Sequence, residues 1–122
     1  MYEDHGSAVL GEMVSLSTGY GCTGLTPDAE PWFFSEVNQS TCAYPTPSTR
    51  VTAIANAIAN LRTGDVLLLE MQLAIFIEIE NQSRFVPAEV TYNVWNLART
   101  AVQTGIVVVA AATVVFTLKD VA

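Results

Sequence analysis

His5 is the residue of this 122-residue chain that is best suited to proton transfer. An imidazole gains or loses a proton near neutral pH, so a positioned histidine can act as a general base or a general acid. Small and apolar residues follow it in the order Gly6-Ser7-Ala8-Val9-Leu10-Gly11. Taken alone, one histidine near the start of a chain is more often an exposed side chain than a catalytic group.

The other reactive side chains form weaker patterns. Cys22 and Cys42 are either one disulfide or, as we favour, buried thiols, because a single pair is not a disulfide framework. Glu78 and Glu80 would share the solvent face of a strand, so we do not expect a general-acid pair. One histidine and two separated cysteines lack the spacing of a zinc site. We therefore predict no metal site and no cofactor.

Composition limits the class of protein. The chain is 51% hydrophobic and 14% charged, which indicates one domain with buried parallel strands or a piece of a larger core. Its net charge of −7, with only 5 Lys and Arg, argues against nucleic acid as a partner, because phosphates need cations to neutralise them.

Targeting signals are weak in this sequence. The longest apolar run, residues 106–118, is shorter than the ~20 residues that a membrane-spanning helix needs. Residues 2–4 are unlike the basic start of a secretory leader. Asn38 and Asn81 each begin an N-glycosylation pattern, which matters only in a secreted protein.

In the first part of the chain we expect one helix and one short strand. A helix over residues 7–16 would turn four side chains inward: Ala8, Val9, Met13 and Leu16. The glycines of residues 17–24 follow a helix and not a strand, so we interpret them as turn positions and not as a phosphate-binding loop. Residues 32–37 fit a short strand, and residues 38–49 a surface loop.

The middle of the chain predicts a helix followed by a strand. Ser48 or Thr49 is expected to cap a helix over residues 50–61, whose inner side would hold Ile54, Ala55, Ile58 and Leu61. After a turn at residues 63–65, the apolar run 66–69 is typical of a strand buried on both faces of a parallel sheet.

The last third repeats this order. Residues 73–84 alternate in polarity and fit either an edge strand or a loop. Pro87 is expected to open a helix that runs to Gln103, with five residues inside: Val90, Val94, Leu97, Ala98 and Ala101. Gly105 would end it before a second fully buried strand over residues 106–111.

Alternating helices and strands predict an α/β fold. Right-handed crossovers would give a parallel sheet with helices on both faces, a three-layer α/β/α architecture. Sites in such sheets lie at the carboxyl ends of the strands.

Four segments, in order, resemble the subtilisin-like serine peptidases (subtilases). Residues 5–11 are similar to the family's catalytic-histidine segment, His-Gly-Thr followed by a small-residue helix, with Ser7 in place of Thr. Residues 19–29 resemble its glycine loop, residues 53–67 its helix into the substrate-binding strand, and residues 101–112 its helix and strand before the oxyanion asparagine. We interpret residues 4–112 as a partial peptidase domain, truncated at both ends, and residues 113–122 as a divergent tail.

The resemblance implies serine endopeptidase chemistry on polypeptide substrates. It makes His5 the general base of an Asp-His-Ser triad. It places Glu70, Met71 and Gln72 at the end of the substrate-lining strand, although these three residues equally fit the plain end of a buried strand. An extracellular location is implied by the family alone.

Several family motifs are missing from this sequence. Asp4 adjoins His5 but is not the family's upstream Asp-Ser/Thr-Gly, and no Gly-Thr-Ser-x-Ala nucleophile motif occurs. Thr113 and Val114 stand where the family has Gly-Asn, and losing one oxyanion donor typically costs ~10²–10³ in rate. We therefore expect the isolated chain to be inactive. The alternative is a non-catalytic α/β module, derived from this scaffold, that binds or self-associates through uncovered sheet edges.

Overall fold

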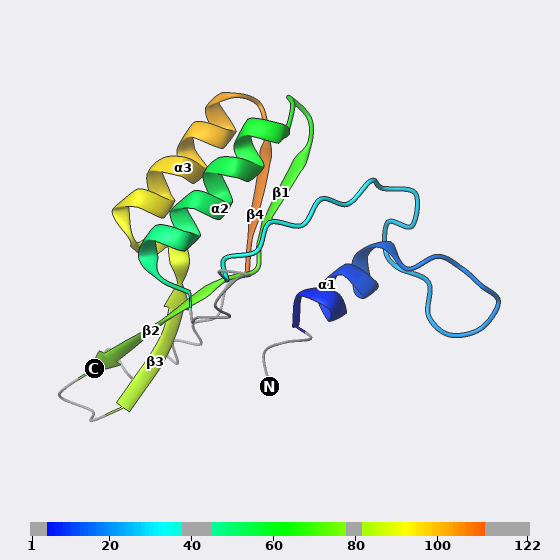
Figure 1. Cartoon of the computed structure of the whole chain (residues 1–122), viewed down its shortest axis with the longest axis horizontal. Helices are drawn as coiled ribbons and strands as arrows, with labels where there is room; N and C mark the ends of the chain where they lie inside the picture. Colours follow the sequence, from blue (N-terminus) through cyan, green and yellow to red (C-terminus); the bar gives the residue numbers. More distant parts are fainter. Residues whose placement is uncertain (1–4, 38–44, 78–81, 112–122) are drawn as a thin grey trace, which may run out of the picture. The chain divides into compact units, whose positions relative to one another are not determined.

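The computed structural model describes residues 5–37, 45–77 and 82–111 (Figure 1). The chain divides into two compact units, residues 1–33 and residues 34–122. The first unit contains α1 (His5–Val14) and the loops that follow it. The second contains α2 (Pro47–Asn60), β1 (Val66–Leu69), β2 (Gln72–Ile77), β3 (Gln82–Pro87), the 3-10 turn η2 (Ala88–Val90), α3 (Tyr92–Gln103) and β4 (Val107–Ala110).

A parallel strand pair and two helices form the body of the second unit. β1 and β4 pair in parallel, with Val66 opposite Val107 and Leu69 opposite Ala110. Figure 1 shows α2 and α3 side by side along one face of this pair. The predicted mixed α/β class is confirmed, and so is the expectation that residues 66–69 and the last strand belong to a parallel sheet.

The core lies between the two helices and the parallel strands. Its most deeply buried large side chains are Ile54 of α2 and Leu69 of β1, each 2% exposed. Burying an aliphatic side chain of this size contributes roughly 1.5–3 kcal/mol to folding. The other buried members of the cluster are Ala57, Leu67, Ala88, Val94, Ala101 and Ile106.

Two glycine turns lead from the helices into the parallel strands and touch each other. The Gly64 amide donates to the Gly105 carbonyl (2.8 Å), and the Thr63 hydroxyl donates to the Thr104 carbonyl (2.8 Å). Gly64 and Gly105 have φ values of 94° and 85°, which favour glycine. The predicted turns at residues 63–65 and at Gly105 are confirmed, and together they align the starts of β1 and β4.

Residues 72–87 form an antiparallel hairpin. β2 pairs with β3 from Gln72 opposite Pro87 to Ile77 opposite Gln82, in a sheet separate from the parallel pair. The alternating sequence pattern fits either an edge strand or a loop, and the structure shows two strands. Proline fits the last position of β3 because it has no amide hydrogen to donate.

Both helices of the second unit begin elsewhere than predicted. α2 is capped by Thr46 and not by Ser48 or Thr49, and Pro47 occupies its first turn, where a missing amide hydrogen is tolerated. Pro87 does not open the last helix. It ends β3, and the helix starts only at Tyr92, after the turn of η2.

Several burial predictions are wrong. Val66, Val107 and Val109 are 58%, 52% and 46% exposed, because the described helices of the second unit cover one face of the strand pair and not both. Val90 is 62% exposed, since it lies in η2 and not in a helix. Ala55 is also exposed.

In the first unit the predicted helix is largely correct, but its ends shift. α1 starts at His5 and ends at Val14, so Leu16 lies beyond it and is 69% exposed. Ala8 is exposed as well, whereas Val9 and Met13 are half-buried. Residues 32–37 are irregular and not a strand, which corrects the prediction made from their apolar character.

Some predictions fall on residues outside the described ranges. They concern Asp4, Cys42, Glu78, Glu80, the glycosylation patterns at Asn38 and Asn81, and the tail over residues 113–122. Among the described residues, no helix has both the length and the apolar character needed to span a membrane.

Candidate functional site

His5 is the first residue of α1, and its side chain is exposed. The next residue, Gly6, lies against the edge of the Phe33 ring: a Cβ atom at Gly6 would come within 2.7 Å of Phe33 Cζ. A larger residue at this position would therefore have to displace the ring. The His-Gly pair that carries the family resemblance is thus placed at a helix start against an aromatic side chain.

The glycine-rich loop after α1 folds back onto the end of the helix. The amides of Gly24, Leu25 and Thr26 donate to the carbonyls of Ser15, Glu12 and Met13, at 2.8, 2.9 and 2.7 Å. Carbonyls at the carboxyl end of a helix have no partner within it, so the returning segment satisfies groups that would otherwise face solvent.

Glycine is required where this segment returns. A Cβ atom on Gly24 would lie 2.6 Å from the carbonyl carbon and oxygen of Met13, and backbone atoms cannot move aside as a side chain can. Gly19 and Gly21 have φ values of 75° and 89° and supply the reversal itself. The interpretation of these glycines as turn positions is therefore confirmed.

The described residues supply His5 with no orienting group. No hydrogen bond or ion pair reaches its imidazole within residues 5–37, 45–77 and 82–111. A catalytic histidine needs a carboxylate to fix its tautomer and to stabilise the imidazolium that forms during the reaction. The described part of the chain thus presents an accessible base without the other two groups of a triad.

The three predicted substrate-binding residues lie at the carboxyl end of β1, where a site was expected. Glu70 and Gln72 are exposed, and Gln72 begins β2 opposite Pro87. Met71 is half-buried, and its side chain packs against the hydrophobic core of the second unit. His5 belongs to the first unit and Glu70–Gln72 to the second. Their role in binding a substrate stays a prediction.

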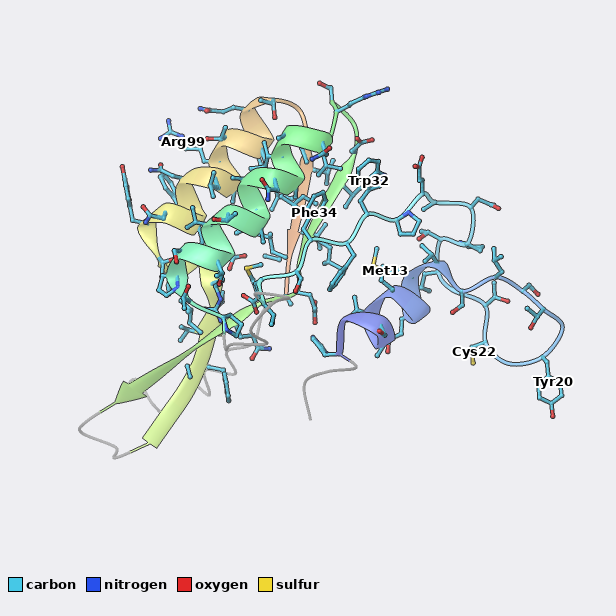
Figure 2. The ribbon with its side chains drawn as sticks, viewed as in Figure 1. Met13, Tyr20, Cys22, Trp32, Phe34 and Arg99 are labelled. Atoms are coloured by element: carbon cyan, nitrogen blue, oxygen red, sulfur yellow. The ribbon has the colours of Figure 1, made fainter. Side chains whose placement is uncertain are left out.

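A shallow depression of about 630 Å³ lies beside α1 in the first unit. Its polar lining includes the Glu12 carboxylate, the Cys22 thiol and the Thr23 hydroxyl, and His5 does not line it. Cys22 is an exposed thiol, which contradicts the buried position that we favoured for it. Figure 2 shows Cys22 on the loop after α1, on the same stretch as Tyr20.

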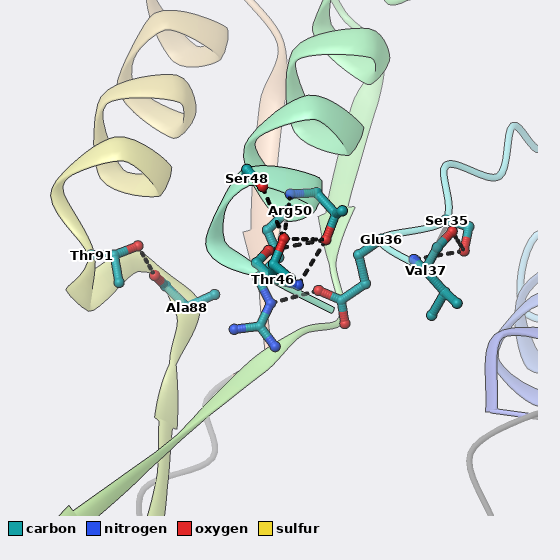
Figure 3. Close-up of polar contacts among 9 residues, drawn as sticks. Ser35, Glu36, Val37, Thr46, Ser48, Arg50, Ala88 and Thr91 are labelled. Carbon is teal, nitrogen blue, oxygen red and sulfur yellow. Dashed lines mark hydrogen bonds and ion pairs between the residues drawn. The ribbon is translucent and has the colours of Figure 1, made fainter. Parts of the chain in front are cut away.

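A second depression, of about 230 Å³, lies at the start of α2 and is lined by hydroxyls and one ion pair partner, Glu36. Glu36 accepts a 2.6 Å hydrogen bond from the Arg50 guanidinium, and both side chains are mostly buried (Figure 3). The Thr46 hydroxyl accepts from the Thr49 amide (3.2 Å), and the Thr49 hydroxyl accepts from the Thr46 amide (2.8 Å). The Thr46 and Thr49 hydroxyls therefore form the N-terminal cap of α2.

Sequence reasoning missed this cluster, although a signal for it exists. Thr46 and Thr49 have the spacing of a capping box, and Pro47 between them is typical of a first helical turn. No comparable pattern links Glu36 to Arg50, whose pairing depends on the path of the chain between them.

Among the described residues, no three His, Cys, Asp or Glu side chains gather closely enough to hold a metal ion.

In comparisons with known proteins, no family model, curated protein or solved structure matches this chain. Any functional assignment therefore rests on the residues themselves.

Proposed function

We propose that this chain is part of a subtilisin-like serine peptidase scaffold, in which His5 serves as the general base for peptide-bond hydrolysis. The observation that carries the proposal is the position of His5 on the first turn of a helix, followed directly by Gly6 and accessible to solvent. A general base must reach a serine hydroxyl, and an exposed imidazole at a helix start can be reached by groups from elsewhere in a domain.

In this reaction His5 would take the proton of a serine hydroxyl as that oxygen attacks the scissile carbonyl. It would then return the proton to the leaving amine. Both steps need a serine nucleophile in place and a carboxylate that orients the imidazole. Because neither family motif occurs in this sequence, the chain by itself is proposed to be inactive.

The proposed architecture has three layers, with helices on both faces of a parallel sheet. α2 and α3 supply one layer. On the strands, Leu67 and Leu69 are buried, whereas Val66, Val107 and Val109 are exposed. An aliphatic second face of this kind is what a further helical layer covers in a three-layer domain, because strands buried on both faces are apolar on both faces.

The proposed substrate is a polypeptide that passes the carboxyl end of β1. Glu70 and Gln72 present polar side chains there, next to the hairpin of β2 and β3. An extracellular location is proposed from the resemblance alone.

The coding sequence on either side of this chain tests the proposal. We expect an Asp-Ser/Thr-Gly motif upstream and a Gly-Thr-Ser-x-Ala motif downstream, in one open reading frame. Neighbouring coding sequence that contains neither motif would contradict the peptidase proposal. A second measurement uses the isolated chain, which we expect neither to cleave a fluorogenic peptide nor to react with a serine-directed phosphonate probe. Labelling by that probe would overturn the proposed inactivity.

A second candidate function is a non-catalytic association module. It is favoured by the exposed aliphatic face of the β1–β4 pair, because a contiguous apolar surface on a folded protein commonly marks an interaction site. A chain that melts cooperatively as a monomer or a defined oligomer would favour this module. Aggregation during light scattering would favour a piece of a larger domain.

A further inference from the structure

The solvent-facing side of α3 carries a stripe of aromatic, aliphatic and cationic side chains, Tyr92, Trp95, Arg99 and Val102, called here the α3 stripe. Tyr92, Trp95 and Val102 are 72%, 45% and 58% exposed. Arg99 is exposed between them, and Figure 2 shows it on the side of α3 turned away from α2. Residues at this spacing line one side of a helix with ~3.6 residues per turn.

In the described part of the second unit, the residues of the stripe are not members of the hydrophobic core. α3 meets the core through its opposite side, where Val94 and Ala101 are buried. The rest of its exposed surface is polar, with Asn93, Thr100 and Gln103. Asn93 and Thr100 lie on the side of α3 away from Trp95 and Val102, whereas Gln103, four residues after Arg99, borders the stripe. Trp, Tyr and Arg are the residues most enriched at the energetic centres of protein interfaces.

The spacing of the stripe points to a second copy as the partner, because steps of three, four and three residues are the same from either end of the helix. Arg99 is the single charged residue of α3 (Tyr92–Gln103), on a chain with a net charge of −7. Two copies of an acidic chain repel each other, and the repulsion is weakest where they meet through surfaces without carboxylates. α3 is such a surface.

Two side chains of the stripe, Trp95 and Arg99, are held against each other. The Arg99 guanidinium lies 5.6 Å from the centroid of the Trp95 ring, within the range of a cation–π interaction. Because the pair orders two long side chains before any partner arrives, binding loses less side-chain entropy.

We propose that the α3 stripe is a homodimer interface in which two copies of the chain pair their α3 helices antiparallel. The spacing of the stripe reads the same in both directions. Antiparallel pairing therefore sets Tyr92 against the partner's Val102 and Trp95 against the partner's Arg99, so that the cation–π contact recurs across the two-fold axis. Parallel pairing would bring two Arg99 guanidinium groups together, which like-charge repulsion disfavours.

The interface is small and the dimer weak. Residues 92–102 span about 15 Å of helix, so each copy contributes less surface than a standard-sized interface and we expect a dissociation constant of about 1–100 µM. This inference uses none of the residues of the proposed peptidase site, and a defined dimer would favour the second candidate function, the association module.

Sedimentation equilibrium of the full chain between about 1 and 300 µM tests the interface. We expect a monomer–dimer equilibrium in the wild type. Val102→Glu and Thr100→Glu form a matched pair, because they add the same charge at exposed positions of the last helical turn, on the stripe and on the side of the helix away from Val102. We expect Val102→Glu to raise the dissociation constant at least ~10-fold and Thr100→Glu to change it less than ~2-fold. Circular dichroism checks that both variants keep their helices.

A charge-pair variant tests the antiparallel direction. Tyr92→Glu/Val102→Lys keeps the net charge and sets each new carboxylate against the partner's new ammonium group in an antiparallel dimer, so we expect it to dimerise. In a parallel dimer the like charges would meet, and a monomeric double variant would overturn the proposed direction. A monomeric wild type, equal effects of the two single Glu variants, or a dimer abolished by Val107→Glu and not by Val102→Glu would overturn the interface.

Discussion

Gly24 lies directly against the backbone of Met13, close enough that a Cβ atom would sit 2.6 Å from the Met13 carbonyl oxygen. The contact brings the segment after the glycine-rich loop onto the last turn of α1, where the next amides along the chain bond the helix's terminal carbonyls. The helix that begins with His5 is thereby closed at its far end by residues that follow it. Its stability depends on a glycine that sequence reasoning had identified only as part of a turn.

Replacement of Gly24 by alanine should loosen α1. The new methyl group meets backbone and not side-chain atoms, so we expect a loss of about 1–3 kcal/mol in local stability, measured as reduced hydrogen-exchange protection of α1 amides. Gly11→Ala is the matched control inside the helix. A Cβ atom there has only Ser15 Oγ nearby, at 3.6 Å, and we expect a gain of up to about 1 kcal/mol. Equal effects of the two substitutions would contradict this account.

Replacement of Gly105 by alanine should destabilise the second unit more than the same change at Gly64. Both residues have positive φ, but only Gly105 also faces a close neighbour, because a Cβ atom there would lie 2.6 Å from Thr63 Cγ2. We expect a loss of about 1 kcal/mol for Gly64→Ala and about 2–4 kcal/mol for Gly105→Ala. Urea unfolding followed by circular dichroism measures both values. A larger loss at Gly64 would show that the packing of the two turns is unimportant.

Removal of the Thr46 hydroxyl should weaken the start of α2. Thr46→Ala breaks the capping box, and we expect it to lower the free energy of unfolding by about 0.5–2 kcal/mol. Thr52 is the control: its hydroxyl bonds the Ser48 carbonyl within the helix, and alanine is the better helix former. Thr52→Ala should therefore be neutral or mildly stabilising. If Thr46→Ala were equally harmless, the cap would have no energetic role.

The turns and the parallel strands were predictable because their signals are local. Gly64 and Gly105 are residues that readily adopt positive φ, as a turn requires. The apolar runs that follow them fit strands that come after helices. Pro87 misled the prediction because proline suits both the first turn of a helix and the end of a strand, and pairing with β2 decided for the strand. The hairpin itself could not be predicted from residues 73–84 alone, since the choice between strand and loop depends on a partner.

Burial was the least predictable property. Val66 and Val109 have the composition of doubly buried strand positions, yet both are exposed in the described structure. An apolar strand can be buried on both faces, but its actual burial depends on whether a helical layer covers each face. The same reasoning applies to His5, because its type suggests general base chemistry but its catalytic use depends on groups brought from elsewhere in a domain.

The most direct test of the proposed function is the effect of His5→Ala on peptide hydrolysis by this chain expressed together with its neighbouring coding sequence. If His5 is the general base of a triad, the substitution should lower kcat by about 10⁴–10⁶-fold while the melting temperature stays unchanged, because the side chain is exposed. Hydrolysis that persists at the wild-type rate in the His5→Ala protein would contradict the account.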